Sequence, residues 1–200
     1  MILVNGIPNS GAHAVMSLLA SFGMERIPGM LFGMDPHHPP QIGATVADPD
    51  IEGLCYSAMK TDRYFLQGRV LFQHASLIDA KVIWVLRHPR NVIVSGVRQL
   101  NQSEPKVSLE EVIRLHNRIG IVGTYRAFMG WRETAMVIRY EDIPPEFTEP
   151  HPALYQDSAK NLDTFTGNPS DWTSVWTEQA DKCWAGMGGP ELEAELGYAI

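Results

Sequence analysis

Short, continuously apolar segments alternate along this chain with segments whose apolar residues recur at helical spacing. Val82 to Leu86 is one such apolar run, and Ile2 to Asn5, Val70 to Phe72 and Ala135 to Tyr140 are others. Continuous runs of this length are typical of strands that are buried on both faces of a parallel sheet. Because strands and helices alternate, the pattern predicts an α/β fold with a central parallel sheet and right-handed crossovers.

The size and charge of the chain indicate how many domains it has and which partners are disfavoured. It has 200 residues, 44% of them hydrophobic, which suffices for one core of ordinary size, so we expect a single domain over residues 1–200. The net charge of −7 disfavours nucleic acid and anionic membranes as partners. No apolar run reaches the roughly 18 residues that cross a bilayer, and no basic leader precedes Ile2. We expect a cytoplasmic protein.

Two other segments carry local signals. Residues 25 to 53 are rich in Pro, Gly and Met without a sustained period, which predicts a long surface loop. Ser108 followed three residues later by Glu111 resembles a capping box, and it predicts the start of a long helix that runs to about Trp131. Pro89 suits the first turn of another helix.

The cysteines and the paired histidines do not indicate a metal site. Cys55 and Cys183 are far apart and outside any CxxC pattern, so we expect two buried, reduced thiols. His37 and His38 beside Asp35 are adjacent and point in different directions, and no second cluster completes a ligand shell. We interpret them as loop residues.

A glycine-rich turn, Gly6 to Gly11, separates the first predicted strand from a helix. Such a turn presents free backbone N–H groups and the positive end of the helix dipole, so it can hold a phosphate or sulfate group. The Lys-Ser/Thr pair of a nucleotide-triphosphate P-loop is replaced by Ala12 and His13, which disfavours a kinase. A turn that merely needs glycine is the other interpretation of this segment alone.

A second segment, residues 82–95, reads VIWVLRHPRNVIVS. It resembles the 3′-phosphate-binding segment of sulfotransferases, in which an arginine at a strand end and a serine eight positions later bind the 3′-phosphate. Arg87 and Ser95 fall on these two positions. A planar guanidinium fork and a hydroxyl are suitable donors to a phosphate group.

Three further stretches agree with that family in their order along the chain. They are the loop at residues 7–11, the Arg-Tyr-Glu-Asp stretch at 139–142, and the Trp-containing segment at 171–179. The resemblance implies a three-layer α/β sandwich with a P-loop NTPase-like sulfotransferase fold. It also implies transfer of a sulfuryl group from 3′-phosphoadenosine 5′-phosphosulfate (PAPS) to a hydroxyl or amine of a small-molecule or carbohydrate acceptor, with 3′-phosphoadenosine 5′-phosphate (PAP) as product and no metal.

The resemblance assigns a binding role to the loop and to one tryptophan. The loop residues expected to hold the 5′-phosphosulfate are Pro8, Asn9, Ser10, Gly11, Ala12, His13 and Ala14. Trp172 is a candidate for stacking near the adenine, although a tryptophan more often has a packing role.

Asn9 is the main departure from the family, which has Lys or Arg at this position. A cation there stabilises the negative charge that grows on the bridging oxygen as the S–O bond breaks, and its loss lowers rates by roughly 10²–10³. Our hypothesis is that Asn9 and the loop amides still hold the 5′ group while His13, Lys60 or Arg63 supplies the charge.

His74 is the first candidate for the base that takes the acceptor proton, because it precedes the Arg87 strand as the family's catalytic histidine does. A structural histidine that caps the strand end is the equal alternative. We expect His88 to face solvent or the phosphate. His116 is expected on the polar side of its helix, and Arg90 and Arg98 are expected to be solvated; Arg90 is also a candidate for adding positive field at the 3′-phosphate.

Two other functions stay open. A nucleotide-binding homologue with weak or no catalysis would explain Asn9, and a P-loop small-molecule kinase would use the same loop differently. Tight binding of PAP without transfer would favour the first, and magnesium-dependent ATP binding would favour the second.

Overall fold

The computed structural model describes residues 1–43, 61, 63–102, 106–115, 119–147 and 172–198. The chain divides into two compact units. We call Met1–Leu86 with Phe128–Gly167 the sheet unit, and Arg87–Ala127 with Asn168–Ile200 the helical unit.

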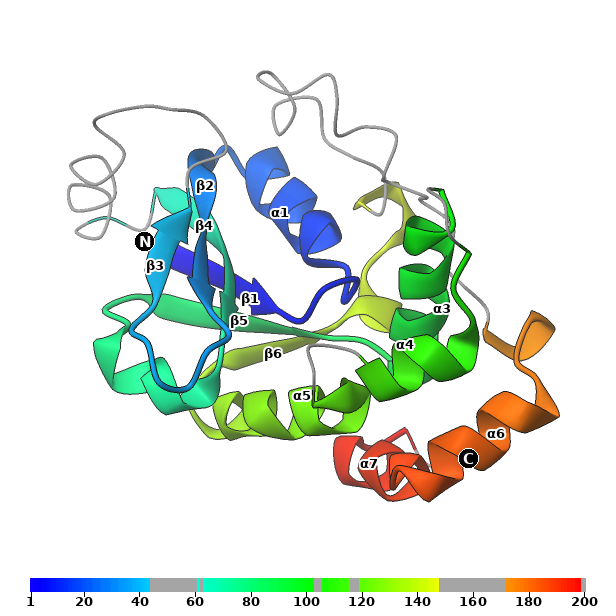
Figure 1. The fold of residues 1–200 in the computed structure, drawn as a ribbon. Helices are drawn as coiled ribbons and strands as arrows, with labels where there is room; N and C mark the ends of the chain where they lie inside the picture. Colours follow the sequence, from blue (N-terminus) through cyan, green and yellow to red (C-terminus); the bar gives the residue numbers. More distant parts are fainter. Residues whose placement is uncertain (44–60, 62, 103–105, 116–118, 148–171, 199–200) are drawn as a thin grey trace. The chain divides into compact units, whose positions relative to one another are not determined.

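The sheet unit contains a six-stranded sheet with the strand order β3-β2-β4-β1-β5-β6 (Figure 1). The strands are β1 (Ile2–Gly6), β2 (Glu25–Gly33), β3 (Gln41–Gly43), β4 (Tyr64–Val70), β5 (Lys81–Leu86) and β6 (Met136–Arg139). All neighbouring strands are parallel except β2 and β3, which are antiparallel. The expected α/β fold with a central parallel sheet is therefore confirmed.

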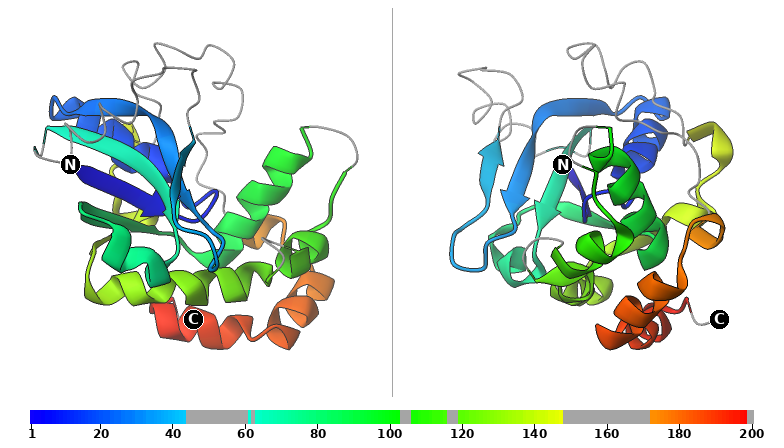
Figure 2. Two further views of the ribbon diagram at one scale, coloured as in Figure 1. Left: turned by 60° about the vertical axis from the view of Figure 1, so that its left-hand side comes forward. Right: turned by 45° about the vertical axis from the view of Figure 1, so that its right-hand side comes forward.

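Helix α1 (Ala12–Ser21) covers one face of this sheet (Figures 1 and 2). Its apolar residues pack against every second residue of the central strands, because side chains alternate between the two faces of a strand. The cluster includes Val15 and Met16 of the helix with Val4, Phe65 and Ile83 of the sheet. Each such fully buried side chain contributes about 1.5–3 kcal/mol. The packing fixes α1 over β1, β4 and β5.

The carboxyl end of β4 is held by groups from later in the chain. Trp131, in the short helix η3 (Gly130–Glu133), donates from Nε1 to the Val70 carbonyl oxygen at 2.9 Å. Its ring also meets Phe72 edge to face, with 5.4 Å between ring centroids. Phe72 begins the 3₁₀ helix η1 (Phe72–Leu77). The predicted strand at residues 70–72 is thus wrong in position: the strand ends at Val70.

The predicted long loop at residues 25–53 is also wrong over its described part, which contains β2 and β3. Pro28 lies inside β2, where the pairing with β4 shifts register between Arg26 and Met30. A proline is tolerated at such an irregularity because it does not have to donate to the ladder there. Residues 44–53 lie outside the described part.

Strand β6 differs from the expectation of a fully buried run. Met136 is 65% exposed, because β6 forms one edge of the sheet. In β5 every residue after Lys81 is buried, as predicted.

The helical unit contains five α-helices among its described residues. They are α3 (Pro89–Leu100), α4 (Leu109–Leu115), α5 (Gly120–Met129, which ends in the sheet unit), α6 (Glu178–Gly186) and α7 (Gly189–Leu196). The capping box is confirmed: Glu111 N donates to Ser108 Oγ at 3.2 Å, and Ser108 N donates to Glu111 Oε2 at 2.7 Å. The predicted single helix to Trp131 is wrong, because α4 and α5 are separate and Gly120 has a φ of 72°.

Candidate functional site

The glycine turn between β1 and α1 has an unusual backbone. Ser10 N donates to the Ile7 carbonyl oxygen at 3.1 Å, which closes the turn. Asn9 has a φ of 66° and Gly11 a φ of 89°, so both residues lie in the left-handed region. Asparagine tolerates this region better than lysine does, because its short polar side chain bonds to nearby backbone. The backbone thus favours the residue that the family pattern does not have.

The start of α1 has the properties of an anion site. Its N-cap residue Gly11 makes no side-chain capping bond, and its first turn contains no acidic residue. The Ser10 hydroxyl is buried and has no hydrogen-bond partner among the described residues. Uncapped helix amides, a positive dipole end and a buried unpartnered hydroxyl together fit a phosphate or sulfate group.

Tyr140, which directly follows β6, packs on this turn. A β-carbon on Gly11 would overlap the Tyr140 ring, so only glycine fits there. Tyr140 also contacts the core cluster under α1. The Arg-Tyr-Glu-Asp stretch identified in the sequence therefore packs against the turn through Tyr140.

Two hydrogen bonds align the carboxyl ends of β1 and β4. Asn5 donates from Nδ2 to the Val70 carbonyl oxygen, and Val70 N donates to Asn5 Oδ1, both at 2.9 Å. Parallel strands place such ends at one edge of the sheet, where ligands of open α/β folds bind. The turn after β1 therefore lies at the same edge of the sheet as η1, the short helix after β4 that contains His74.

His74 is buried, and its Nε2 lies 2.9 Å from the carbonyl oxygen of Asp35. A carbonyl oxygen only accepts, so Nε2 carries the hydrogen and Nδ1 is the atom that can accept a proton. The contact gives His74 a structural role. Its role as the base stays a prediction that would use Nδ1.

His13, at the second position of α1, is uncharged at neutral pH. Burial lowers its pKa from 6.5 to about 4, and the positive charges of Arg26 and Arg69 contribute to this shift. In the free protein this argues against His13 as the source of the positive charge, because a partly buried imidazole beside two cations takes up a proton less readily.

The other two candidates for that charge are Arg63 and Lys60. Arg63 is exposed and its Nε lies 3.3 Å from Glu25 Oε1. Lys60 lies outside the described residues. The sequence analysis did not identify Arg26 or Arg69 as candidate site residues. If the strand had been placed at residues 64–70, the alternation of its side chains would have indicated that Arg69 shares a face with Phe65.

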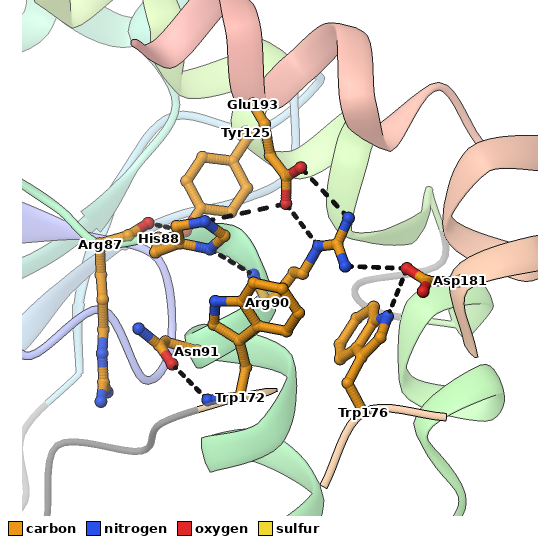
Figure 3. Close-up of polar contacts among 9 residues, drawn as sticks. All are labelled: Arg87, His88, Arg90, Asn91, Tyr125, Trp172, Trp176, Asp181 and Glu193. Atoms are coloured by element: carbon orange, nitrogen blue, oxygen red, sulfur yellow. Dashed lines mark hydrogen bonds and ion pairs between the residues drawn. The ribbon is translucent and has the colours of Figure 1, made fainter. Parts of the chain in front are cut away.

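Arg87, the first residue of the helical unit, is only 5% exposed. Its carbonyl oxygen accepts a hydrogen bond from the Tyr125 hydroxyl at 2.5 Å. Figure 3 shows its side chain extending away from His88 and Glu193. Ser95 lies partly exposed on the second turn of α3. Their shared role at a 3′-phosphate stays a prediction.

Arg90 is buried at the centre of a polar and aromatic cluster (Figure 3). Its Nε donates to Glu193 Oε1 and its Nη1 to Asp181 Oδ1, each at 2.8 Å. The guanidinium carbon lies 4.3 Å from the ring centroid of Trp172 and 5.0 Å from that of Trp176. The expectation of a solvated Arg90 is wrong, because two carboxylates and two aromatic faces replace water around it.

His88 caps α3, since its Nδ1 accepts a hydrogen bond from Arg90 N at 3.3 Å. Its ring stacks on Trp172 at 5.7 Å between centroids and also meets Tyr198. It is largely buried, which corrects the expectation of a solvent-facing residue. Trp172 also donates its backbone N–H to Asn91 Oδ1, so it has a packing role within the helical unit. Its stacking on adenine stays a prediction.

His37 and His38 lie in a loop, as interpreted from the sequence. Asp35 is held by backbone N–H of His37 and by the His38 side chain, and these bonds lower the pKa of its carboxyl. Within the described ranges no group of three or more metal-binding side chains occurs. Cys183 is a buried free thiol, as expected. Arg98 is partly exposed, and Cys55, His116 and Asp171 lie outside the described residues.

None of the helices in the described ranges is both long enough and apolar enough to span a bilayer.

Comparisons with known proteins support the fold. No family model matches the chain. No curated protein matches it in sequence. Among solved structures, the mouse sulfotransferase SULT7A1 in complex with PAP matches with a TM-score of 0.62 and 14% sequence identity, covering 100% of this chain and 89% of the mouse chain. The chain therefore has the fold of this sulfotransferase.

Proposed function

We propose that the protein binds PAPS and transfers its sulfuryl group to a hydroxyl or amine of a small-molecule or carbohydrate acceptor. The observation that carries the proposal is the β1–α1 turn, where an uncapped helix start and a buried, unpartnered Ser10 hydroxyl form a fitting seat for an oxyanion. The mouse protein with the same fold is described as a sulfotransferase complexed with PAP, which supports extending that ligand to this chain.

The proposal assigns each end of the nucleotide to one stretch of the chain. Residues 8–14 would bind the 5′-phosphosulfate through backbone N–H groups and the Ser10 hydroxyl. Arg87 and Ser95 would bind the 3′-phosphate, in line with the sulfotransferase-like segment 82–95. A guanidinium and a hydroxyl form charge-assisted hydrogen bonds to phosphate, which are about twice as strong as neutral ones.

The reaction needs one base and one stabilised leaving group. The acceptor oxygen or nitrogen forms a new bond to sulfur while the bond from sulfur to the bridging oxygen breaks. The electron pair of the broken bond goes to the 5′-phosphate of the departing PAP, and the acceptor proton goes to the base. His74 would receive that proton at Nδ1, because its Nε2–H is directed to the Asp35 carbonyl.

A binding protein without catalysis is the second candidate, and Asn9 favours it. Asn9, whose backbone lies in the left-handed region, occupies the position where sulfotransferases carry a cation. The turn itself therefore has no positive charge to stabilise the leaving group. The two functions share the nucleotide site and differ only in turnover.

Calorimetric titration with PAP tests the shared site. We expect saturable 1:1 binding by the wild type, and weaker binding by Arg87→Gln and Ser95→Ala. Arg114→Gln is the matched control, because Arg114 is exposed on α4 in the same unit. Absence of PAP binding by a folded wild type would overturn the proposal, and magnesium-dependent ATP binding in its place would favour a kinase.

A turnover assay then separates the enzyme from the binding protein. His74→Gln keeps an amide donor for the Asp35 carbonyl, so the fold should be retained while transfer of labelled sulfate from PAPS falls by about 10²–10⁴-fold. Unchanged transfer in this variant would assign His74 a structural role only. PAP binding with no transfer in the wild type would favour the binding protein.

A further inference from the structure

We propose that Arg26 of β2 and Arg69 of β4 supply the positive charge that Asn9 lacks, and that with the start of α1 they form the seat of the transferred sulfuryl group. This inference rests on the proposed function. In this arrangement two cations from neighbouring strands take the place of the Lys or Arg that sulfotransferases carry on the turn.

The strand register places both arginines on the face of the sheet that α1 covers. Phe65 packs in the core cluster with α1, and Arg69, four residues later on β4, faces the same side. Arg26 is the in-register partner of Phe65, and Phe32 is the partner of Arg69, so these residues share that face. Arg69 is at the carboxyl end of β4, at the edge from which the β1–α1 turn also begins.

The pKa of His13 agrees with a position of both arginines near the start of α1. Positive charge from Arg26 and from Arg69 acts on the imidazole of His13, which belongs to the first turn of the helix. Such an effect requires short separations, because charge interactions fall with distance and are screened by solvent. The helix start, its dipole and two guanidinium groups thus act on one region of the sheet unit.

Arg69 has the surroundings of a ligand-binding cation. Burial lowers its pKa, and no acidic side chain contributes to that shift. Its guanidinium carbon lies 5.9 Å from the centroid of the Phe32 ring, and none of the described carboxylates forms an ion pair with it. A partly buried cation that has no counter-charge among the described residues is stabilised by an anionic ligand.

The nearest acidic side chain on β2 is directed elsewhere. Glu25 is adjacent to Arg26 in sequence and therefore faces the opposite side of the strand, where it pairs with exposed Arg63. The first turn of α1 has no acidic residue. The positive field at this site is thus not cancelled by these neighbours.

Comparing PAPS with PAP tests the inference, because the two nucleotides differ only in the sulfuryl group. Calorimetry should show that Arg26→Gln and Arg69→Gln weaken PAPS binding at least about tenfold more than PAP binding, as expected for the loss of a charge-assisted contact. Arg63→Gln is the control and should change neither. Arg69→Lys should restore part of the PAPS affinity.

The outcomes separate this inference from the proposed function. If the wild type binds neither nucleotide, the proposed function fails. If the wild type binds both, but the arginine variants affect PAPS and PAP equally or not at all, the function stands and the inference is wrong. Where transfer is measured, the variants should lose roughly 10²–10³-fold in rate.

A second measurement on the unmutated protein covers the case in which a variant does not fold. The His13 ring resonances can be titrated by NMR in the free, PAP-bound and PAPS-bound protein. A sulfuryl group seated between the arginines should raise the His13 pKa more in the PAPS complex than in the PAP complex, because a nearby anion favours the imidazolium form. An equal His13 pKa in both complexes would contradict the inference.

Discussion

The ring of Tyr140 lies against the α-carbon of Gly11, so the N-cap of α1 has no room for a side chain. The tyrosine comes from the end of β6 and the glycine from the turn after β1. Their contact links the shape of the anion-binding turn to a residue 129 positions later in the chain.

Gly11→Ala should therefore destabilise the protein through two effects. A φ of 89° disfavours any L side chain by about 1–2 kcal/mol, and overlap with Tyr140 adds about 1–3 kcal/mol. Gly23→Ala is the matched control, because Gly23 has a φ of 77° but no atom near its missing β-carbon. Urea unfolding should show the larger loss for Gly11→Ala. Equal losses would mean that Tyr140 does not constrain the turn.

Asn9→Lys restores the residue type of sulfotransferases but places it in left-handed backbone. We expect a loss of up to about 1 kcal/mol in unfolding free energy relative to Asn9→Gly, because lysine lacks the local bonding of asparagine. If Arg26 and Arg69 already supply the charge, the gain in sulfate transfer should fall well short of the roughly 10²–10³-fold expected for a missing oxyanion partner. A gain of that full size would show that nothing compensates for Asn9.

Arg90→Gln should be the most destabilising of the charge-removing variants. It leaves the buried Glu193 carboxylate, which is only 4% exposed, without its partner, and such losses amount to about 3–5 kcal/mol. Adding Glu193→Gln should recover part of the loss. Lys182→Gln breaks the exposed pair with Glu178 and should change the unfolding free energy by no more than about 0.5 kcal/mol. Similar thermal midpoints for both single variants would contradict the buried-pair assignment.

The lowered pKa of His13 should make the stability of the protein depend on pH. Its pKa is about 4 in the folded chain, against 6.5 for a histidine in an unfolded chain, so between these values the unfolded chain binds the extra proton. Stability is then fully retained above 6.5 and decreases as the pH falls toward 4, by roughly 2 kcal/mol at about pH 4.5. His13→Gln should lose this part of the dependence. Unfolding free energies of both proteins at neutral pH and about pH 4.5 check the difference, and parallel pH profiles would contradict it.

The parts of the fold that follow from local patterns were predicted from the sequence. The apolar run of β5, the start of α3 at Pro89, the Ser108 capping box and the turn before α1 each depend on residues that are close in sequence. Strand β2 was missed because Pro28 is a strand breaker unless the partner strand accommodates a register shift, which only the pairing with β4 reveals.

Long-range partners account for the errors at the site. Arg90 was expected in solvent because its partner Glu193 lies 103 positions away. His13 was expected to carry charge because its burial and the nearby charges of Arg26 and Arg69, which together lower its pKa, depend on long-range packing. The turn itself was found from its glycines, and the reason for Gly11 depends on Tyr140, which the sequence indicated only as part of a family motif.

The contribution of the 3′-phosphate to binding decides whether this protein uses the nucleotide of sulfotransferases. Calorimetry should give a dissociation constant for PAP at least about tenfold below that for adenosine 5′-phosphate, and Arg87→Gln should remove this difference. Equal affinities of the wild type for the two nucleotides, or a difference that persists in Arg87→Gln, would contradict the assignment of Arg87 to the 3′-phosphate and with it the proposed donor.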